Sequence, residues 1–137
     1  METADKLAIN ELLAQSAFAL DTKNLSDLEA GFTPDAHFTL DIEGVDEVSK
    51  FAGREAIMGL MRGALETQTD DRRHVISNVH YQQASPDRAT VVSYLTLMAT
   101  ENGVTQLITT GIYTDVVALH KGKWLIADRQ LKLDRPY

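Results

Sequence analysis

ATVVSYLTLMATENGVTQLITTGIYTDVVALHKGKWLIADRQLKL, residues 89–133, is the stretch that decides the fold. It holds three long β-rich runs, separated by Asn102-Gly103 and by residues 120–123. Asn-Gly between two such runs is a strong hairpin signal, because both central residues of a type I′ turn need a positive φ. The stretch therefore predicts an antiparallel meander with strands over 89–100, 104–119 and 124–133. Strands this long must bend or curl to stay compact.

Toward the N-terminus, the periodicity of apolar residues predicts three helices. The first runs from about Asp5 to Leu20. A second, shorter helix is capped by Asn24 or Ser26 and is ended by Pro34-Asp35, and a third starts near Gly53. Alternation over 36–41 predicts a strand between the second and third helices, residues 43–49 are expected to form a flexible loop, and a further strand starts at Arg73. The fold class is therefore α+β, with helices packed on one sheet face.

Length and composition fit one domain over residues 1–137. At 137 residues and 44% hydrophobic, the chain can build a core large enough for a small-molecule pocket. The absence of cysteine excludes disulfides, thiolate metal sites and a cysteine nucleophile. A formal charge of −7 argues against a nucleic-acid partner, which needs clustered Lys and Arg. No apolar run approaches the roughly 18 residues of a membrane span, so we expect a soluble, cytoplasmic protein with no membrane partner.

Asp21 closes the apolar stripe of the first predicted helix. Leu13, Ala17 and Asp21 are spaced i, i+4, i+8, so the carboxylate points toward the core if the helix extends that far. A buried carboxylate needs a partner, and His74 is the main candidate. In a second interpretation, residues 21–24 form a turn and Asp21 is solvated, with an Asx-type hydrogen bond. Spacing alone does not separate the two interpretations.

His74 is predicted on a strand face that it shares with Ile76, Asn78 and His80. A histidine on such a mixed face is a surface or structural residue unless it has a partner. A carboxylate beside an imidazole fixes the ring tautomer and stabilises the imidazolium, which leaves the other nitrogen free to take a proton. With Asp21, His74 can therefore abstract a carbon-bound proton, while Asn78 or Arg129 steadies the developing negative charge.

Arg129 lies on the last predicted strand in an otherwise apolar row with Leu125, Ala127, Leu131 and Leu133. An arginine in such a row is either paired with a buried carboxylate or aimed at a bound anion or oxyanion. Alternatively, its guanidinium reaches solvent at a sheet edge.

Several large side chains are expected mainly in the core or on the sheet faces, where some of them can line a pocket for a ring-shaped ligand. The candidates for substrate binding, besides Asn78, are Phe18, Phe38, Tyr94, Met98 and Tyr113. No metal site is predicted, because His37 and His120 lack acidic residues at ligand spacing, and His74 and His80 lie too far apart to chelate one ion easily. No phosphate-binding loop or serine nucleophile motif is present, and no cofactor is expected.

Five segments together resemble the SnoaL-like branch of the nuclear transport factor two-like superfamily: FALD (18–21), FTPDA (32–36), GREAI (53–57), RHVISN (73–78) and GIYTD (111–115). The resemblance covers nearly the whole chain. It implies a cone-shaped curved antiparallel sheet packed against three N-terminal helices around a deep apolar pocket. It also implies a homodimer or higher homo-oligomer formed through the outer sheet face.

The same resemblance implies roles for the site residues. In scytalone dehydratase and hexachlorocyclohexane dehydrochlorinase, which share this fold, an Asp at the end of the first helix supports a His that acts as the base. Asp21 and His74 match those positions, and Arg129 matches a pocket arginine of the dehydrochlorinase. The chain departs from the dehydrochlorinase where that enzyme has a pocket lysine, since it offers only Gln15 or Ser16 there.

Residues and resemblance together predict a cofactor-independent lyase or isomerase. It would act on a small apolar, cyclic substrate by His/Asp general acid-base proton transfer. The alternative is a non-catalytic small-ligand-binding or assembly module of the same fold. The first predicts that the pocket converts its ligand, and the second that the ligand is released unchanged.

Overall fold

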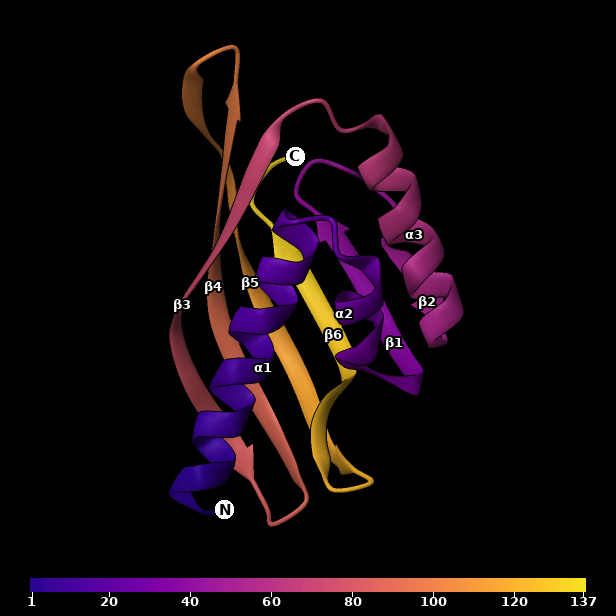
Figure 1. Ribbon diagram of the computed structural model, residues 1–137, viewed down its shortest axis with the longest axis vertical. Helices are drawn as coiled ribbons and strands as arrows, with labels where there is room; N and C mark the ends of the chain where they lie inside the picture. The colour runs from indigo at the N-terminus through magenta and orange to yellow at the C-terminus, as the bar shows by residue number, and fades with distance from the viewer.

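The computed structural model describes all of residues 1–137 as an α+β fold with three helices and a six-stranded curved sheet. The helices are α1 (Thr3–Asp21), α2 (Leu25–Ala30) and α3 (Arg54–Thr67). The strands are β1 (Phe32–Ile42), β2 (Ser49–Ala52), β3 (Asp71–Ala84), β4 (Arg88–Glu101), β5 (Val104–His120) and β6 (Lys123–Leu133). All three helices cover one face of the sheet, which stays open and does not close into a barrel (Figure 1). The predicted fold class is confirmed.

The sheet has the order β2-β1-β6-β5-β4-β3. Four of its five strand pairs are antiparallel, among them the β4–β5 and β5–β6 pairs of the predicted meander. The fifth pair, β1 with β6, is parallel and places Phe38 beside Arg129. This pairing joins the first strand of the chain to the last, and it places β6 near the centre of the sheet.

One predicted boundary is wrong, and one strand was not predicted. The second helix ends at Ala30 and not at Pro34, because Gly31 provides its C-cap and β1 already begins at Phe32. The predicted loop after β1 is followed by a short strand, β2, which pairs with β1 and was not predicted. Its four residues carry almost no alternation, since only Phe51 is partly buried.

Helix α1 is anchored to the sheet at both ends. Near its start, Asp5 accepts a hydrogen bond from the indole N–H of Trp124 on β6, at 3.1 Å. At its end, Asp21 contacts β3. Between these points, Ile9 and Leu13 are buried against the sheet. The helix is therefore held across the concave face, and its last residue has a fixed position.

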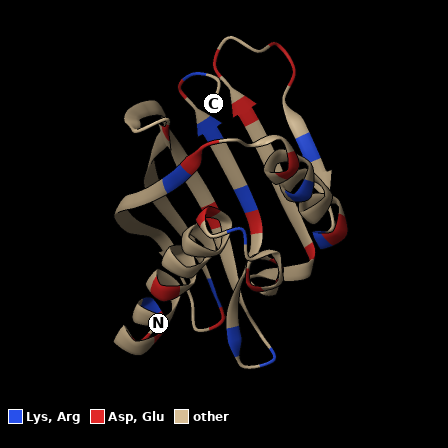
Figure 2. Cartoon of the chain, turned by 45° about the horizontal axis from the view of Figure 1, so that its top comes forward, with Lys and Arg blue, Asp and Glu red and all other residues tan.

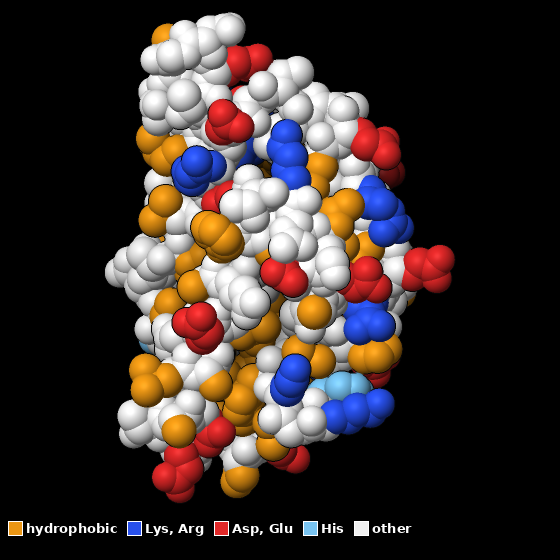
Figure 3. All heavy atoms as spheres, in the orientation of Figure 1, with side chains coloured by type: hydrophobic (Ala, Val, Ile, Leu, Met, Phe, Trp, Pro, Cys, Tyr) orange, Lys and Arg blue, Asp and Glu red, His pale blue; other side chains and the backbone are white.

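Apolar side chains also reach the outer surface of α1 (Figure 3). Leu7 and Phe18 are both 68% exposed. Phe18, one of the predicted substrate-binding residues, does not line the cavity described below, because it lies on the exposed side of the helix. None of the helices is long and apolar enough to cross a membrane.

Candidate active site

Asp21 and His74 are in direct contact. The Oδ1 atom of Asp21 lies 2.5 Å from Nδ1 of His74, and Oδ2 accepts a hydrogen bond of 2.9 Å from the backbone N–H of His74. Both carboxylate oxygens are thus used by one residue. The Asp21 side chain is 9% exposed, which excludes the solvated turn and confirms the interpretation in which it points inward.

The end of α1 explains how Asp21 reaches β3. Thr22 is the C-cap, and its hydroxyl donates to the carbonyl of Phe18, at 2.7 Å. Lys23 then takes a positive φ of 59°, which turns the chain toward α2. Asp21 is therefore the last helical residue, still on the face of α1 that packs against the sheet.

The protonation of His74 follows from these bonds. An ionised carboxylate only accepts hydrogen bonds, so Nδ1 must carry the hydrogen that lies between it and Asp21. In the neutral ring, Nε2 is then an acceptor, and it bonds no other protein group. His74 lines the main cavity, so the imidazole presents a proton acceptor to any bound ligand.

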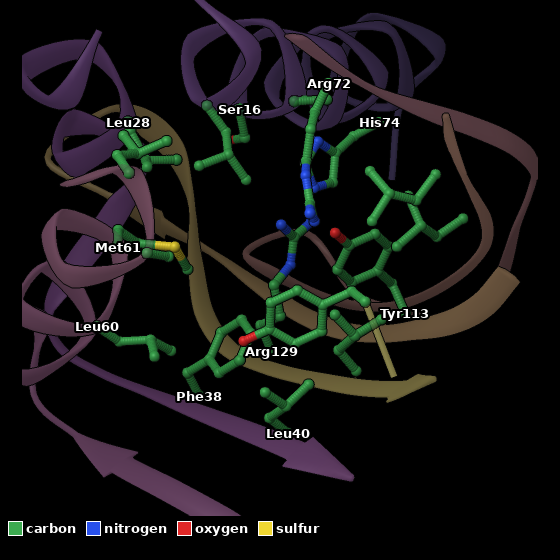
Figure 4. Close-up of a pocket in the computed structure, with 18 of the residues that line it drawn as sticks. Ser16, Leu28, Phe38, Leu40, Leu60, Met61, Arg72, His74, Tyr113 and Arg129 are labelled. Atoms are coloured by element: carbon green, nitrogen blue, oxygen red, sulfur yellow. The ribbon is translucent and has the colours of Figure 1, made fainter. Parts of the chain in front are cut away.

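The cavity has a volume of about 390 Å³, and 18 of its 26 lining residues are hydrophobic. Figure 4 shows the nitrogen-bearing side chains of Arg72, His74 and Arg129 gathered in one region, while Leu28, Leu60 and Met61 from α2 and α3 lie on the opposite side. A cavity with one polar and one apolar wall holds a mostly apolar ligand with its polar group in a defined orientation.

Arg129 is buried and paired with Asp115, which is fully buried. Nε and Nη2 of Arg129 donate to the two carboxylate oxygens at 2.8 and 3.0 Å. Burial alone would lower the pKa of Arg129, but the Asp115 carboxylate outweighs it, and the pKa is raised above its ordinary value. Of the predicted environments of Arg129, the structure shows the pairing with a buried carboxylate and not the solvent-exposed sheet edge.

Tyr113 packs under Arg129, with the guanidinium carbon 4.1 Å from the ring centroid. Burial raises the pKa of Tyr113 above its ordinary value, although the Arg129 charge opposes the shift. The phenol is therefore a hydrogen-bond donor at neutral pH, and it lines the cavity together with Phe38. No group of three His, Asp or Glu side chains is placed to hold a metal ion.

The model of the SnoaL-like domain matches residues 1–130. The chain belongs to this family. No curated protein is detectably similar to it in sequence.

Solved structures confirm the fold of this SnoaL-like domain. A protein of unknown function with a cystatin-like fold from Nostoc punctiforme is 28% identical, has a TM-score of 0.81, and is matched over 98% of this chain and 94% of that one. ActVI-ORFA from Streptomyces coelicolor is 19% identical, with a TM-score of 0.83 and coverage of 96% and 98%. The β subunit of a putative aromatic-ring-hydroxylating dioxygenase from Novosphingobium aromaticivorans is 18% identical, with a TM-score of 0.83 and coverage of 99% and 94%. The shared architecture is the cystatin-like fold, and one further match, from Novosphingobium aromaticivorans, is an NTF2-like protein with this fold.

Three further predicted substrate-binding residues of the SnoaL-like domain do not line its cavity. Tyr94 and Met98 lie on the convex face of the sheet, because they alternate with Leu95 and Leu97, which point into the cavity. Asn78 is exposed at a bulge in β3, where it adopts a positive φ of 54°. The bulge ends the alternation that placed Asn78 on the same face as His74.

Arg72 and Asp115 were not among the predicted site residues. Arg72 lines the cavity two residues before His74, so the alternation of β3 could have identified it. It is paired with Asp70, at 2.9 Å between Nε and Oδ1. Asp115 gave a weaker signal, as an acid among apolar residues on β5, and its pairing with Arg129 depends on the register of β5 and β6.

Proposed function

We propose that this SnoaL-like domain is a cofactor-independent lyase or isomerase that acts on a small, apolar, cyclic substrate by proton transfer. The observation that carries the proposal is the contact of 2.5 Å between Asp21 and His74 at the polar wall of an otherwise apolar cavity. A base is most effective where water is largely excluded and where its conjugate acid is stabilised. Asp21 supplies that stabilisation.

The proposed step begins at Nε2 of His74, which accepts a proton from a substrate carbon next to a carbonyl group. The electron pair of the broken C–H bond moves onto the carbonyl oxygen and forms an enolate. N–H groups of Arg129 and the hydroxyl of Tyr113 are the donors available to that oxygen. In an isomerase, the enolate collapses back to the carbonyl and His74 returns the proton to another carbon of the same conjugated system. In a lyase, the returning electron pair breaks the bond between the neighbouring carbon and a leaving group, and that group takes the proton from His74.

Exchange of carbon-bound hydrogen for deuterium tests this step without knowledge of the natural substrate. The probe is 1-tetralone, a neutral bicyclic ketone, incubated with the protein in D₂O and followed by mass spectrometry. We expect exchange above the buffer rate, and a loss of about 10²–10⁴-fold in His74→Ala. His80→Ala is the matched control, because His80 lies on the same strand, exposed, beyond the bulge.

Two outcomes contradict the proposal. In the first, His74→Ala catalyses exchange as fast as the unmodified protein. In the second, the protein binds 1-tetralone and related ring ketones but never exchanges them faster than buffer. The second outcome favours the alternative function, a ligand-binding or assembly module.

We also propose that the protein forms a homodimer through the convex face of the sheet. Val75, Tyr94 and Ile112 are 46%, 51% and 41% exposed on three adjacent strands, with Tyr94 directly opposite Ile112. Apolar side chains clustered on an exposed sheet face are typical of an interface. Light scattering should give the mass of two chains, and Ile112→Glu the mass of one. A single-chain mass before mutation contradicts this proposal.

A further inference from the structure

Arg129 has donors left for a ligand. Its Nε and Nη2 atoms bond Asp115, whereas Nη1 has no hydrogen-bond partner in the protein. Nη1 is not fully buried either. The only fully buried side-chain nitrogen or oxygen atoms that lack a hydrogen-bond partner belong to Thr33 and Ser93. The guanidinium lines the cavity, so these free N–H groups can donate to the polar group of a bound molecule.

The polar wall of the cavity is rich in hydrogen-bond donors but carries no excess of positive charge. Each cation of the cavity is matched by a carboxylate: Arg129 by Asp115, Arg72 by Asp70, and His74, once protonated, by Asp21. Elsewhere, acidic and basic residues are scattered over helices, loops and strands without gathering into one patch (Figure 2). The cavity thus offers hydrogen-bond donors without a net positive charge.

From this pairing we infer that Asp115 determines ligand specificity and makes the cavity select rings with a neutral carbonyl group over rings with a carboxylate. The inference rests on the proposed function only in placing the polar group of the ligand against Arg129. Asp115 does not touch the ligand, because it lies behind the guanidinium and is fully buried. It acts through the charge of Arg129.

The physical reason is the balance between desolvation and attraction. A carboxylate that enters the cavity loses strong hydration, and this cost is repaid only by an uncompensated cation. Arg129 would attract the anion, but Asp115, bonded to the same guanidinium at 2.8 and 3.0 Å, repels it. A neutral carbonyl oxygen loses far less hydration and still accepts hydrogen bonds from Arg129.

Two ligands of the same shape test the inference. Methyl 2-naphthoate is neutral, and 2-naphthoate is fully ionised at about pH 7.5. We expect the ester to bind about tenfold more tightly or better, measured by isothermal titration calorimetry. Equal or tighter binding of 2-naphthoate overturns the inference. Neither compound has a hydrogen on the carbon next to its carboxyl group, so binding is measured without turnover, and failure of the proposed catalysis does not affect the result.

Variants test Asp115 itself. Asp115→Asn leaves the charge of Arg129 uncompensated, so the ester preference should fall about tenfold or invert, while the control Asp128→Asn keeps it. An unchanged preference in folded Asp115→Asn overturns the inference. The double variant Asp115→Asn/Arg129→Gln decides the case if the single variant does not fold. Asp115 and Arg129 together are neutral, so removing both charges should leave the preference for the ester over 2-naphthoate within about threefold of that of the unmodified protein. If the double variant selectively loses 2-naphthoate binding, the inference is overturned.

Discussion

Substitution of Asp21 by Asn should switch the tautomer of His74 and remove its base. Asp21 accepts two hydrogen bonds from His74, one from the backbone N–H at 2.9 Å and one from Nδ1 at 2.5 Å. These two bonds end on different carboxylate oxygens, and Asn keeps an oxygen at only one of the two positions, with an NH₂ group at the other. The backbone N–H is always a donor, whereas the imidazole can move its hydrogen from Nδ1 to Nε2. The amide oxygen should therefore face the backbone, and its NH₂ group should donate to Nδ1.

The consequence for the cavity is large, while the consequence for stability is small. With Nδ1 as an acceptor, the ring hydrogen moves to Nε2, and the atom that faces the cavity becomes a donor. Proton abstraction should then fall by about 10²–10⁴-fold, the range expected for loss of a positioned general base. Both contacts to His74 persist in altered form, so the free energy of unfolding should fall by only about 1–3 kcal/mol, because two charge-assisted hydrogen bonds are each reduced to a neutral one.

Two measurements check this prediction. Nitrogen-15 NMR of the imidazole should place the hydrogen on Nδ1 in the unmodified protein and on Nε2 in Asp21→Asn, and this requires no substrate. Deuterium exchange into 1-tetralone gives the rate. Asp46→Asn, in the exposed loop after β1, is the control for a change of one charge. The reasoning is refuted if Asp21→Asn keeps the Nδ1–H tautomer, or if it exchanges 1-tetralone within about tenfold of the unmodified rate.

Three further predictions concern the fold that supports the site. Phe32→Ala should cost about 3–5 kcal/mol in urea unfolding because Phe32 is fully buried, and a cost below 1 kcal/mol contradicts its place in the core. Gly111→Ala should lower the melting temperature, since its Cβ would lie 2.6 Å from the carbonyl oxygen of Lys132, whereas Gly59→Ala, with open space, should stabilise α3 by about 0.5–1 kcal/mol. Burial raises the pKa values of Tyr81 and Tyr113 above the ordinary value of 10.0, so two tyrosines should ionise late in an ultraviolet titration. Only one of them should remain in Tyr113→Phe, which lacks the Tyr113 phenol proton. Because the unfolded state then releases this proton first, the stability that Tyr113 contributes is present below pH 10 and is lost as the pH rises above it.

The contact between Asp21 and His74 could be predicted because each residue lies at the boundary of a regular element. Helical spacing oriented Asp21, and alternation oriented His74 over the few residues before any irregularity. The resemblance then placed the two ends together. Local periodicity is reliable over such short distances, since neither orientation depends on a long run of regular structure.

The rest of the site depended on bulges that periodicity does not reveal. The bulge at Asn78 changes which residues of β3 face the cavity, so Asn78 was misplaced. In β6, a register shift between Ile126 and Asp128 lets Ile126 and Arg129 both point inward, although they are three residues apart. The pairing of Asp115 with Arg129 follows from that shifted register. One extra residue reverses every later orientation in a strand, which is why these partners could not be predicted from alternation alone.

The three carboxylates around the cavity favour a reaction in which charge moves but is not created. While His74 is neutral, the polar wall of the cavity carries one more negative than positive charge, because Asp21 then has no cationic partner. When His74 takes a proton from a neutral substrate, the wall becomes neutral and the substrate becomes an anion. The total charge inside the cavity is unchanged, so no ion has to enter a poorly solvated space. A substrate that arrived as an anion would add a second negative charge to the same wall, which makes neutral carbon acids the substrates that this arrangement favours.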